Sequence, residues 1–485
     1  MLKRHISTLI LFPLVLGGCS AVGPDFKEPP VNSPEKWRVD VPMDAPSAAN
    51  LPWWEVFKDE DLQRLIRTGL EQNREIRAAL ARIEQGRAAL GVSNAAFLPS
   101  VGYNGTALHG DPKTTQLAGP HGYMLGGSVQ WEVDLWGRVR RLNESARAQY
   151  FASNENKNAV VLALVAEIAV GYFNLRMLDA QVAIAEQTAW TREAAWKLAK
   201  DRLEKDVGNA IDALQFEADM IAAQTSVVSL KNAIVVQENA LSLLLGELPK
   251  SVARKAVAES NAALPPIPAG LPSDILLNRP DLRAAVQNVH AANAQIGAAV
   301  ANYFPKISLT GVLGFVHPQL GHLLEGGNRQ SQAGGSLLGP IFDGGTTYYS
   351  VKAAEARTRE AVLNYEQTAL NAFREVNDAL SSLRAARERV ALLRREAGVL
   401  TSALEKTRRA YEAGKVALLP VLDADRNLFS VKLTLAEAQA TELTAGVRLY
   451  KALGGGWRTN DLKKPLVASD GQIAGAPNST ENKGK

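Results

Sequence analysis

The stretch YMLGGSVQWEV, from Tyr123 to Val133, alternates apolar residues on one side with small or polar residues on the other. A period of two is typical of a β-strand. An apolar face opposite a small or polar face is the pattern of a strand that turns toward lipid on one side and toward a wet lumen on the other. A half-buried strand of a soluble sheet has the same period, so both interpretations stay open at this point.

Three more segments show this alternation: Ile307 to Phe315 and, less clearly, Val101 to Leu108 and Gln332 to Phe342. Long polar loops, His109 to Gly122 and His317 to Ser331, join the four predicted strands in pairs. Four strands cannot close a membrane barrel, because the smallest have about eight, and lipid does not tolerate open edges. Either the sheet is soluble or several chains pool their strands, and three chains would give about twelve.

A proline-free helical run follows each predicted hairpin, from Gly137 to Gly208 and from Gly345 to Gly414. About seventy residues at roughly 1.5 Å each make a rod of about 100 Å, which cannot fold into a compact globule. Each run turns into a returning helix, and Gly208 and Gly414 are expected to adopt the left-handed conformation that ends helices. Apolar residues at a mostly 3-4 spacing predict a coiled-coil seam in each run, in the first Leu164, Ile168, Leu175, Val182, Trp196 and Leu203.

The chain contains an internal repeat of about 206 residues. NREIRAA at 73–79 recurs as RPDLRAA at 279–285, Gly137 matches Gly345, and Gly208 matches Gly414, with offsets that drift by about two residues. Fixed-period self-similarity indicates two copies of one structural unit. The predicted boundaries are repeat 1 at 51–263 (hairpin 100–133, long helix 138–207, return helix 210–246), a proline-rich linker at 264–272, repeat 2 at 273–457 (hairpin 306–342, long helix 346–413, return helix 418–454) and a disordered tail at 458–485.

The amino terminus predicts export. Lys3 and Arg4 precede an apolar run too short to span a bilayer, and LGGC ends it at Cys19, the only cysteine of 485 residues. Residues 1–18 are therefore expected to be a signal peptide. LGGC resembles the bacterial lipobox, which implies a lipid on Cys19, a lipidated Pro-rich arm at 19–50 and, with Ser20 in the next position, sorting to the outer membrane. The alternative is an incidental cysteine behind an ordinary signal sequence.

Composition excludes several function classes. A net charge of +4 and no basic run with interleaved aromatics argue against nucleic-acid binding. No stretch after Cys19 reaches about eighteen apolar residues, so we expect no membrane helix. No nucleophile elbow, phosphate loop or metal spacing appears, so we expect no enzyme, no metal and no cofactor beyond the lipid. Four of the six histidines lie in the two predicted loops, where we expect them to be solvated: His109, His121, His317 and His322.

Four motifs carry a resemblance that runs from about Leu51 to Trp457: WWEVFKDEDL from Trp53, EVDLWGR from Glu132, NRPDLR from Asn278, and YEAG from Tyr411 followed by VLDA from Val421. They resemble the TolC-like outer-membrane factors and, with the lipobox, the NodT-type lipoprotein subgroup of tripartite efflux systems. The implied fold is an α+β membrane protein, a trimeric 12-stranded transmembrane β-barrel with four strands per chain, continuous with a long periplasmic α-helical coiled-coil barrel.

The same resemblance implies a function and partners. The homotrimer would be a passive conduit from periplasm to exterior in an efflux or export system. It would sit in outer-membrane lipid, and a periplasmic adaptor and a proton-driven inner-membrane pump would open its periplasmic tip. A periplasmic coiled-coil adaptor lipoprotein is the alternative, although it should carry one helical hairpin rather than two in tandem. A purely structural coiled-coil lipoprotein would not need the alternating strands.

The resemblance also implies gate residues at the periplasmic tip. The family places aspartates there, and Asp423 matches one, while Pro420 replaces another. The family further ties neighbouring tip helices through a tyrosine, an aspartate and a basic residue. Tyr411 and Asp212 match the first two, Asp212 only with a two-residue gap after Gly208. The basic position reads Val416, and Lys415 and Arg426 are the candidates to substitute for it. The alternatives are a solvated helix face for Asp423 and the coiled-coil seam for Tyr411.

Overall fold

The computed structural model describes residues 21–39, 56, 58–109, 121–255 and 272–455. The signal peptide, Cys19, the remainder of the arm, most of the linker and the tail lie outside these ranges. The chain forms two compact units, residues 1–38, 75–160 and 271–377 in unit 1, and residues 39–74, 161–270 and 378–485 in unit 2. Each unit combines parts of both sequence repeats, so a repeat is not itself a compact unit.

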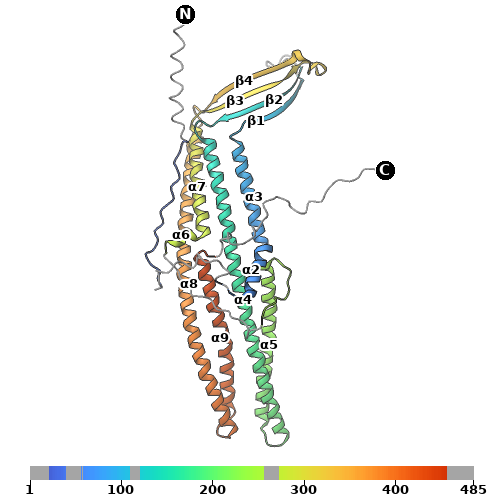
Figure 1. Cartoon of the computed structure of the whole chain (residues 1–485), viewed down its shortest axis with the longest axis vertical. Coiled ribbons are helices and arrows are strands. Elements are labelled where there is room, and N and C mark those ends of the chain that lie inside the picture. The colour runs from blue at the N-terminus through green and yellow to red at the C-terminus, as the bar shows by residue number, and fades with distance from the viewer. Residues whose placement is uncertain (1–20, 40–55, 57, 110–120, 256–271, 456–485) are drawn as a thin grey trace, which may run out of the picture. The chain divides into compact units, whose positions relative to one another are not determined.

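Unit 1 contains one antiparallel sheet of four strands in the order β1-β2-β3-β4 (Figure 1). The strands are β1 (Ser100–His109), β2 (His121–Val133), β3 (Lys306–His317) and β4 (Arg329–Leu338). The sequence placed the last strand at 332–342, which is wrong at both ends. Pro340 has no N–H to donate to a strand ladder, so pairing stops before it, at Leu338 opposite Lys306.

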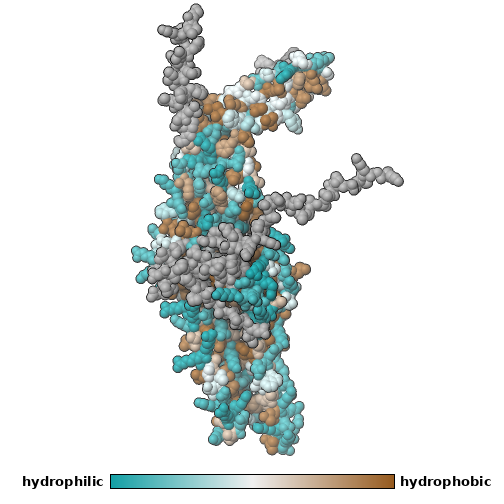
Figure 2. Space-filling view, viewed as in Figure 1, coloured by the Kyte–Doolittle hydropathy of each residue, from teal (hydrophilic) through white to brown (hydrophobic). Residues whose placement is uncertain are grey.

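The register places the apolar residues of neighbouring strands on one face. Val129 lies opposite Val101, and Trp131 lies opposite Leu309. The intervening positions carry Ser128 opposite Gly102 and Val312, and Gln130 opposite Ser100 and Thr310. Several large apolar and aromatic side chains of the sheet are exposed in the single chain: Val101, Tyr103, Leu125, Val129, Trp131, Leu309 and Leu313. Figure 2 shows brown, hydrophobic patches over the sheet.

The strand ends of unit 1 are fastened to helices. The helices are α3 (Arg74–Ala95), which begins at the unit boundary, α6 (Asp274–Asn278), α7 (Pro280–Val300) and the first parts of α4 (Arg138–Glu204) and α8 (Thr346–Glu412). Trp136, between β2 and α4, stacks on Phe304 with ring centroids 4.6 Å apart, and its indole N–H donates to the carbonyl of Pro305 at 2.9 Å. Arg138 pairs with Glu132 at 2.7 Å. These contacts fix the passage from strand to helix.

Unit 2 is helical and consists of α2 (Glu60–Gln72), α5 (Ala210–Leu245), α9 (Leu419–Ala452) and the remainders of α4 and α8. Asp59 caps α2 by accepting the backbone N–H groups of Asp61 and Leu62. The side chain of Gln237 on α5 donates to the carbonyl of Gly171 on α4 at 3.0 Å. Fully or nearly fully buried side chains between these helices form the core: Leu62, Ile66, Ile168, Tyr172, Leu175, Leu241 and Leu245.

The long helices α4 and α8 have 67 residues each. They end at Glu204 and Glu412, three and one residues earlier than the sequence suggested. Among the described residues, α4 contains an 18-residue stretch apolar enough to cross a membrane, and 61% of that stretch is buried. The expectation that no such stretch follows Cys19 was therefore wrong. A core helix packed on several sides can be as apolar as a membrane helix, which explains both the composition and the burial.

Candidate functional site

The turn between α4 and α5 in unit 2 carries the first predicted tip glycine. The left-handed residue is Asp206, with φ 59°, and not Gly208, so that prediction was wrong. The N–H of Val207 donates to the carbonyl of Arg202 at 3.0 Å, which closes the helix end as a Schellman motif does. Gly208 is needed for another reason, because a Cβ there would lie 2.7 Å from the backbone nitrogen of Leu203.

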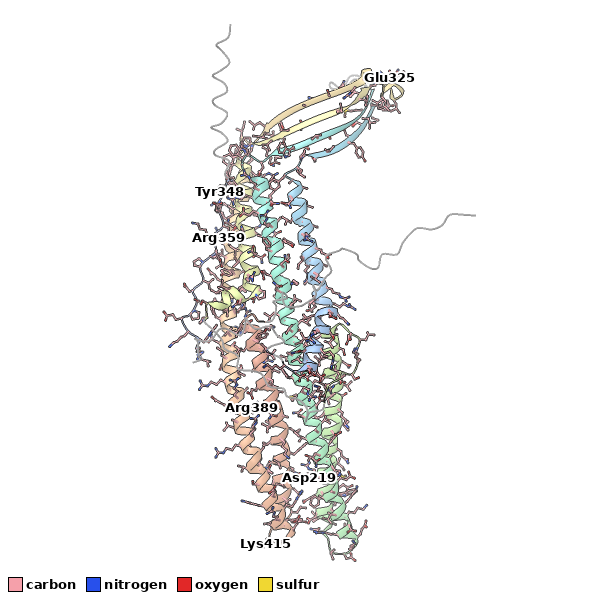
Figure 3. All side chains as sticks on the ribbon, in the orientation of Figure 1. Asp219, Glu325, Tyr348, Arg359, Arg389 and Lys415 are labelled. Atoms are coloured by element: carbon pink, nitrogen blue, oxygen red, sulfur yellow. The ribbon has the colours of Figure 1, made fainter. Side chains whose placement is uncertain are left out.

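The turn between α8 and α9 follows the prediction. Gly414 has φ 70°, and the N–H of Lys415 donates to the carbonyl of Ala410 at 2.8 Å. Lys415 stands at this tip in Figure 3. Behind the turn, three buried residues of α9 and its approach pack against apolar side chains of α5 and α8: Leu418, Val421 and Leu422 against Phe216, Leu404 and Tyr411.

The structure gives a constant repeat register at these turns. The starts of α4 and α8 (138 and 346), their ends (204 and 412) and the left-handed residues (206 and 414) all differ by 208 residues. Asp212 and Pro420 then each stand six residues after the left-handed position. The two-residue gap that the sequence comparison needed for Asp212 disappears, because Asp206 rather than Gly208 corresponds to Gly414.

Tyr411 and Asp212 lie close together, as the resemblance implied. The phenol of Tyr411, on α8, donates to Oδ2 of Asp212, on α5, at 3.4 Å. Burial raises the pKa of the Tyr411 phenol, and the nearby carboxylate of Asp212 raises it further. The long distance indicates a weak hydrogen bond, so this contact links the two helical hairpins without locking them.

Arg426 binds a residue that the sequence analysis did not select. Its guanidinium donates to Oδ1 of Asp219 at 2.9 Å, whereas Oδ1 of Asp423 is 3.9 Å away. Asp219 lies on α5, further from the tip than Lys415 (Figure 3), and its side chain is only 8% exposed. The side chain of Asp423 is 58% exposed. Arg426 therefore joins α9 to α5, and Asp423 remains open to solvent in the single chain.

A second buried ion pair extends this contact. Arg192, on α4, binds Asp425 through Nε at 2.8 Å and donates from Nη1 to the backbone carbonyl of Asp219 at 3.0 Å. We call Arg192, Asp219, Asp425 and Arg426 the tip charge network. Among the described side chains, Nη2 of Arg192 and Oδ2 of Asp219 are buried without a hydrogen-bond partner. Each such group costs about 1–3 kcal/mol, so the network stabilises the contact between the two hairpins less than its ion pairs suggest.

A signal for Arg192 was present in the sequence. Leu175, Val182 and Trp196 follow a heptad-like spacing, and Arg192 falls four residues before Trp196, at a position where the seam should be apolar. A charge at a seam position requires a partner on the facing helix. Asp219 and Asp425 carry no such signal, because their burial depends on the packing of α5 and α9.

A groove of about 650 Å³ opens between the two hairpin tips of unit 2. Its floor carries Phe216 and Tyr411, and its rim carries Trp190, whose side chain is 67% exposed, together with Arg202 and Asp212. An apolar floor inside a charged rim is the arrangement found in protein–protein interfaces.

The described residues hold no group of three or more His, Cys, Asp or Glu that could bind a metal ion. His317 and His322 have ring centroids 5.6 Å apart near the end of β3, and His322 pairs with Glu325 at 2.6 Å. The side chains of His109 and His121 lie outside the described part of the chain.

Comparison with known proteins gives a consistent result. A family model described as outer membrane efflux protein matches residues 65–247 and again 271–455, one match in each repeat. The chain is 31% identical over 453 residues to the cation efflux system protein CusC of Escherichia coli, covering 92% of this chain and 97% of that protein. It is 33% identical over 470 residues to the probable efflux pump outer membrane protein TtgC of Pseudomonas putida, covering 94% of this chain and 96% of that protein. A third relative is the probable outer membrane lipoprotein SilC of Salmonella typhimurium. It is 30% identical over 452 residues, which cover 91% of this chain and 97% of that protein.

Solved structures show the same fold. A membrane protein from Pseudomonas aeruginosa superposes with a TM-score of 0.84 at 31% identity, covering 92% of this chain and all of that one. The open state of the MtrE outer membrane channel of Neisseria gonorrhoeae gives a TM-score of 0.81 at 29% identity, covering 90% of this chain and 99% of that one. This likeness confirms the predicted fold class, an α+β outer-membrane channel with four strands per chain.

Proposed function

The chain belongs to the outer membrane efflux protein family and is the outer-membrane channel of an efflux system, and we propose that it works as a trimeric, passive conduit gated at its helical tips. The family is a family of channels and not of enzymes. The chain is an outer-membrane protein, since its relatives are named as outer membrane proteins. The periplasmic adaptor, the alternative reading of the sequence, is not supported by these comparisons.

The observation that carries the trimer is the pair of open sheet edges. Among the residues that the structure describes, β1 pairs only with β2, and β4 pairs only with β3, so each outer strand has one side without a partner strand in the same chain. Unpaired backbone groups in lipid cost several kcal/mol each, so the edges must pair with other copies. Three copies supply twelve strands, enough for a closed barrel with its apolar face in lipid and its Ser, Thr and Gln face around a lumen.

The gate that we propose is the tip charge network together with Tyr411, Asp212 and Asp423. Three copies of the exposed Asp423 would form a ring of like charge at the narrow end, which attracts cations and repels anions. Opening requires the α8–α9 hairpin to separate from the α4–α5 hairpin. Three contacts between the hairpins oppose this separation. Arg426 binds Asp219, Arg192 binds Asp425, and Tyr411 forms a weak hydrogen bond to Asp212.

The adaptor is the partner that we assign to the groove between the tips. Its apolar floor at Phe216 and Tyr411 lies beside Asp212, so a bound partner helix would press on the contact that closes the tip. An inner-membrane pump, driven by protons, would act through the adaptor. The lipid on Cys19, which the structure does not describe, would hold the chain on the membrane without a cofactor.

Inter-copy strand pairing tests the proposal. Single cysteines introduced along β1 and β4, in a protein whose native Cys19 carries lipid, should cross-link between copies when they face each other across the joined edges. Native mass spectrometry of the purified protein should give three times the mass of one chain. A folded monomer, or no cross-link between a β1 cysteine of one copy and a β4 cysteine of another, would contradict the barrel.

A further inference from the structure

The first described residues of the mature chain run across unit 1 in a defined path. The N–H of Val22 donates to the carbonyl of Trp136 at 3.0 Å, and the side chain of Asn293 donates to the carbonyl of Pro24 at 3.0 Å. Further along, Trp37 is 3% exposed and its ring centroid lies 6.5 Å from that of Phe373. Neither the conduit nor the gate needs these contacts.

Arg141 makes most of the contacts with this segment. Its Nε donates to the carbonyl of Val22 at 3.1 Å, and its Nη2 lies 3.4 Å from the carbonyl of Ala21 and 3.3 Å from that of Gly23. Nη2 also binds Asp25 at 2.8 Å. The Arg141 side chain is only 6% exposed. A guanidinium offers five donors in a fixed plane, so this one residue holds three successive carbonyls and a carboxylate.

Beside Arg141, two glycines let the backbone of the segment approach the backbone of α7 closely. Gly23 has φ +93° and lies against Gly297 of α7 so closely that a Cβ on Gly23 would collide with the Cα of Gly297. A Cβ on Gly297 would lie 2.7 Å from the carbonyl oxygen of Val22 and 2.8 Å from Nε of Arg141. A side chain at either glycine would therefore force the segment away from α7.

The far end of the segment has its own partner. Phe26 stacks on the ring of His290 of α7, with centroids 4.3 Å apart and planes 14° from parallel. Nε2 of His290 is 2.9 Å from Oε1 of Glu144, and Oε2 of Glu144 is 2.9 Å from Nη1 of Arg141. One carboxylate thus positions both the guanidinium and the imidazole that meet the segment.

We propose that Arg141, Gly297 and His290 form a binding site whose ligand is the extended segment Ala21 to Phe26 of this same chain. The bound segment joins α4 to α7 near the start of α4. It also fixes where the chain's amino-terminal end leaves the protein, because Cys19 precedes Ala21 by two residues, at most about 7 Å of chain. If Cys19 carries the lipid of the proposed function, the site sets the height of the helical body below the membrane surface.

Hydrogen–deuterium exchange of the full-length protein tests this site, read on the peptide that contains the Val22 amide. Arg141→Gln should raise the exchange rate of that peptide about tenfold or more, because several charge-assisted bonds are lost. Arg147→Gln is the matched control, since Arg147 lies on the same helix, is exposed and has no ion pair in the described chain. It should leave the exchange unchanged.

Gly23→Ala provides a second variant that leaves the helices intact, because the new methyl group lies on the segment itself. It should release the segment to the same extent as Arg141→Gln. Unchanged protection in both variants, or equal loss in Arg147→Gln, would overturn the site. Exchange is measured on the folded protein without any current, so failure of the channel proposal would be recognised separately.

Discussion

The guanidinium of Arg426, on α9, donates to the carboxylate of Asp219, on α5, at 2.9 Å, and this contact spans the two hairpins of unit 2. Asp219 is nearly buried, whereas the Arg426 side chain is 47% exposed. Loss of Arg426 therefore leaves a buried carboxylate without its charged partner. Loss of Asp219 leaves an arginine that water can still reach.

Arg426→Ala should weaken tip closure by about 1–3 kcal/mol and raise the open fraction of single channels, because Asp219 keeps its buried charge. Arg426→Ala combined with Asp219→Ala should recover part of the closure, since the unpaired charge is then absent. Arg384→Ala is the control, because its partner Glu388 is 66% exposed, and exposed pairs contribute little. Equal currents from Arg426→Ala and the unaltered protein would remove this pair from the gate.

Tyr411→Phe should lower tip stability by about 0.5 kcal/mol, a small loss because the bond to Asp212 is long. The pKa of the phenol is raised in the folded chain, by burial and then by Asp212. The contribution is therefore fully present below the pKa of a free tyrosine, about 10, and is lost as pH rises through the raised value. Denaturation measured from pH 6 to 9 should show a constant difference between the two proteins, and a difference that grows in this range would contradict the assignment.

Asp423→Ala should weaken the block of channel current by divalent cations, because it removes the proposed ring of exposed carboxylates. Asp201→Ala is a suitable control. Asp201 belongs to the same tip region, is 53% exposed and pairs with Lys205, and we give it no role in the gate. If block is the same in Asp423→Ala and the unaltered protein, Asp423 does not line the constriction.

Asp206→Gly should stabilise the α4–α5 turn by about 1 kcal/mol, because glycine has no Cβ penalty at φ 59°. Gly414→Ala should destabilise the α8–α9 turn by about 1–2 kcal/mol for the converse reason. Urea midpoints of the two variants would measure both effects. A stabilising Gly414→Ala would show that the left-handed assignment of this turn is wrong.

The sequence predicted features that depend on periodicity. The alternation from Tyr123 to Val133 marked a strand, and the proline-free runs after Gly137 and Gly345 marked two long helices, because both patterns follow from local geometry. The end of the last strand was placed at residue 342, beyond Pro340, although a proline cannot donate a hydrogen bond to a strand ladder.

The tip contacts were harder to predict. Tyr411 and Asp212 were paired through a family resemblance and not through spacing. Gly208 was assigned the left-handed position because glycine is the usual residue there, whereas the chain uses Asp206 and needs Gly208 for close approach. Asp219 could not be found, since its burial arises only when α4, α5 and α9 pack together.

Single-channel recording in planar lipid bilayers tests the central claim most directly. The purified full-length protein, with its trimeric mass verified, should give discrete conductance steps, and Arg426→Ala should lengthen the open events. A properly folded trimer that inserts into the bilayer and yields no discrete steps would contradict the assignment of this chain as a channel.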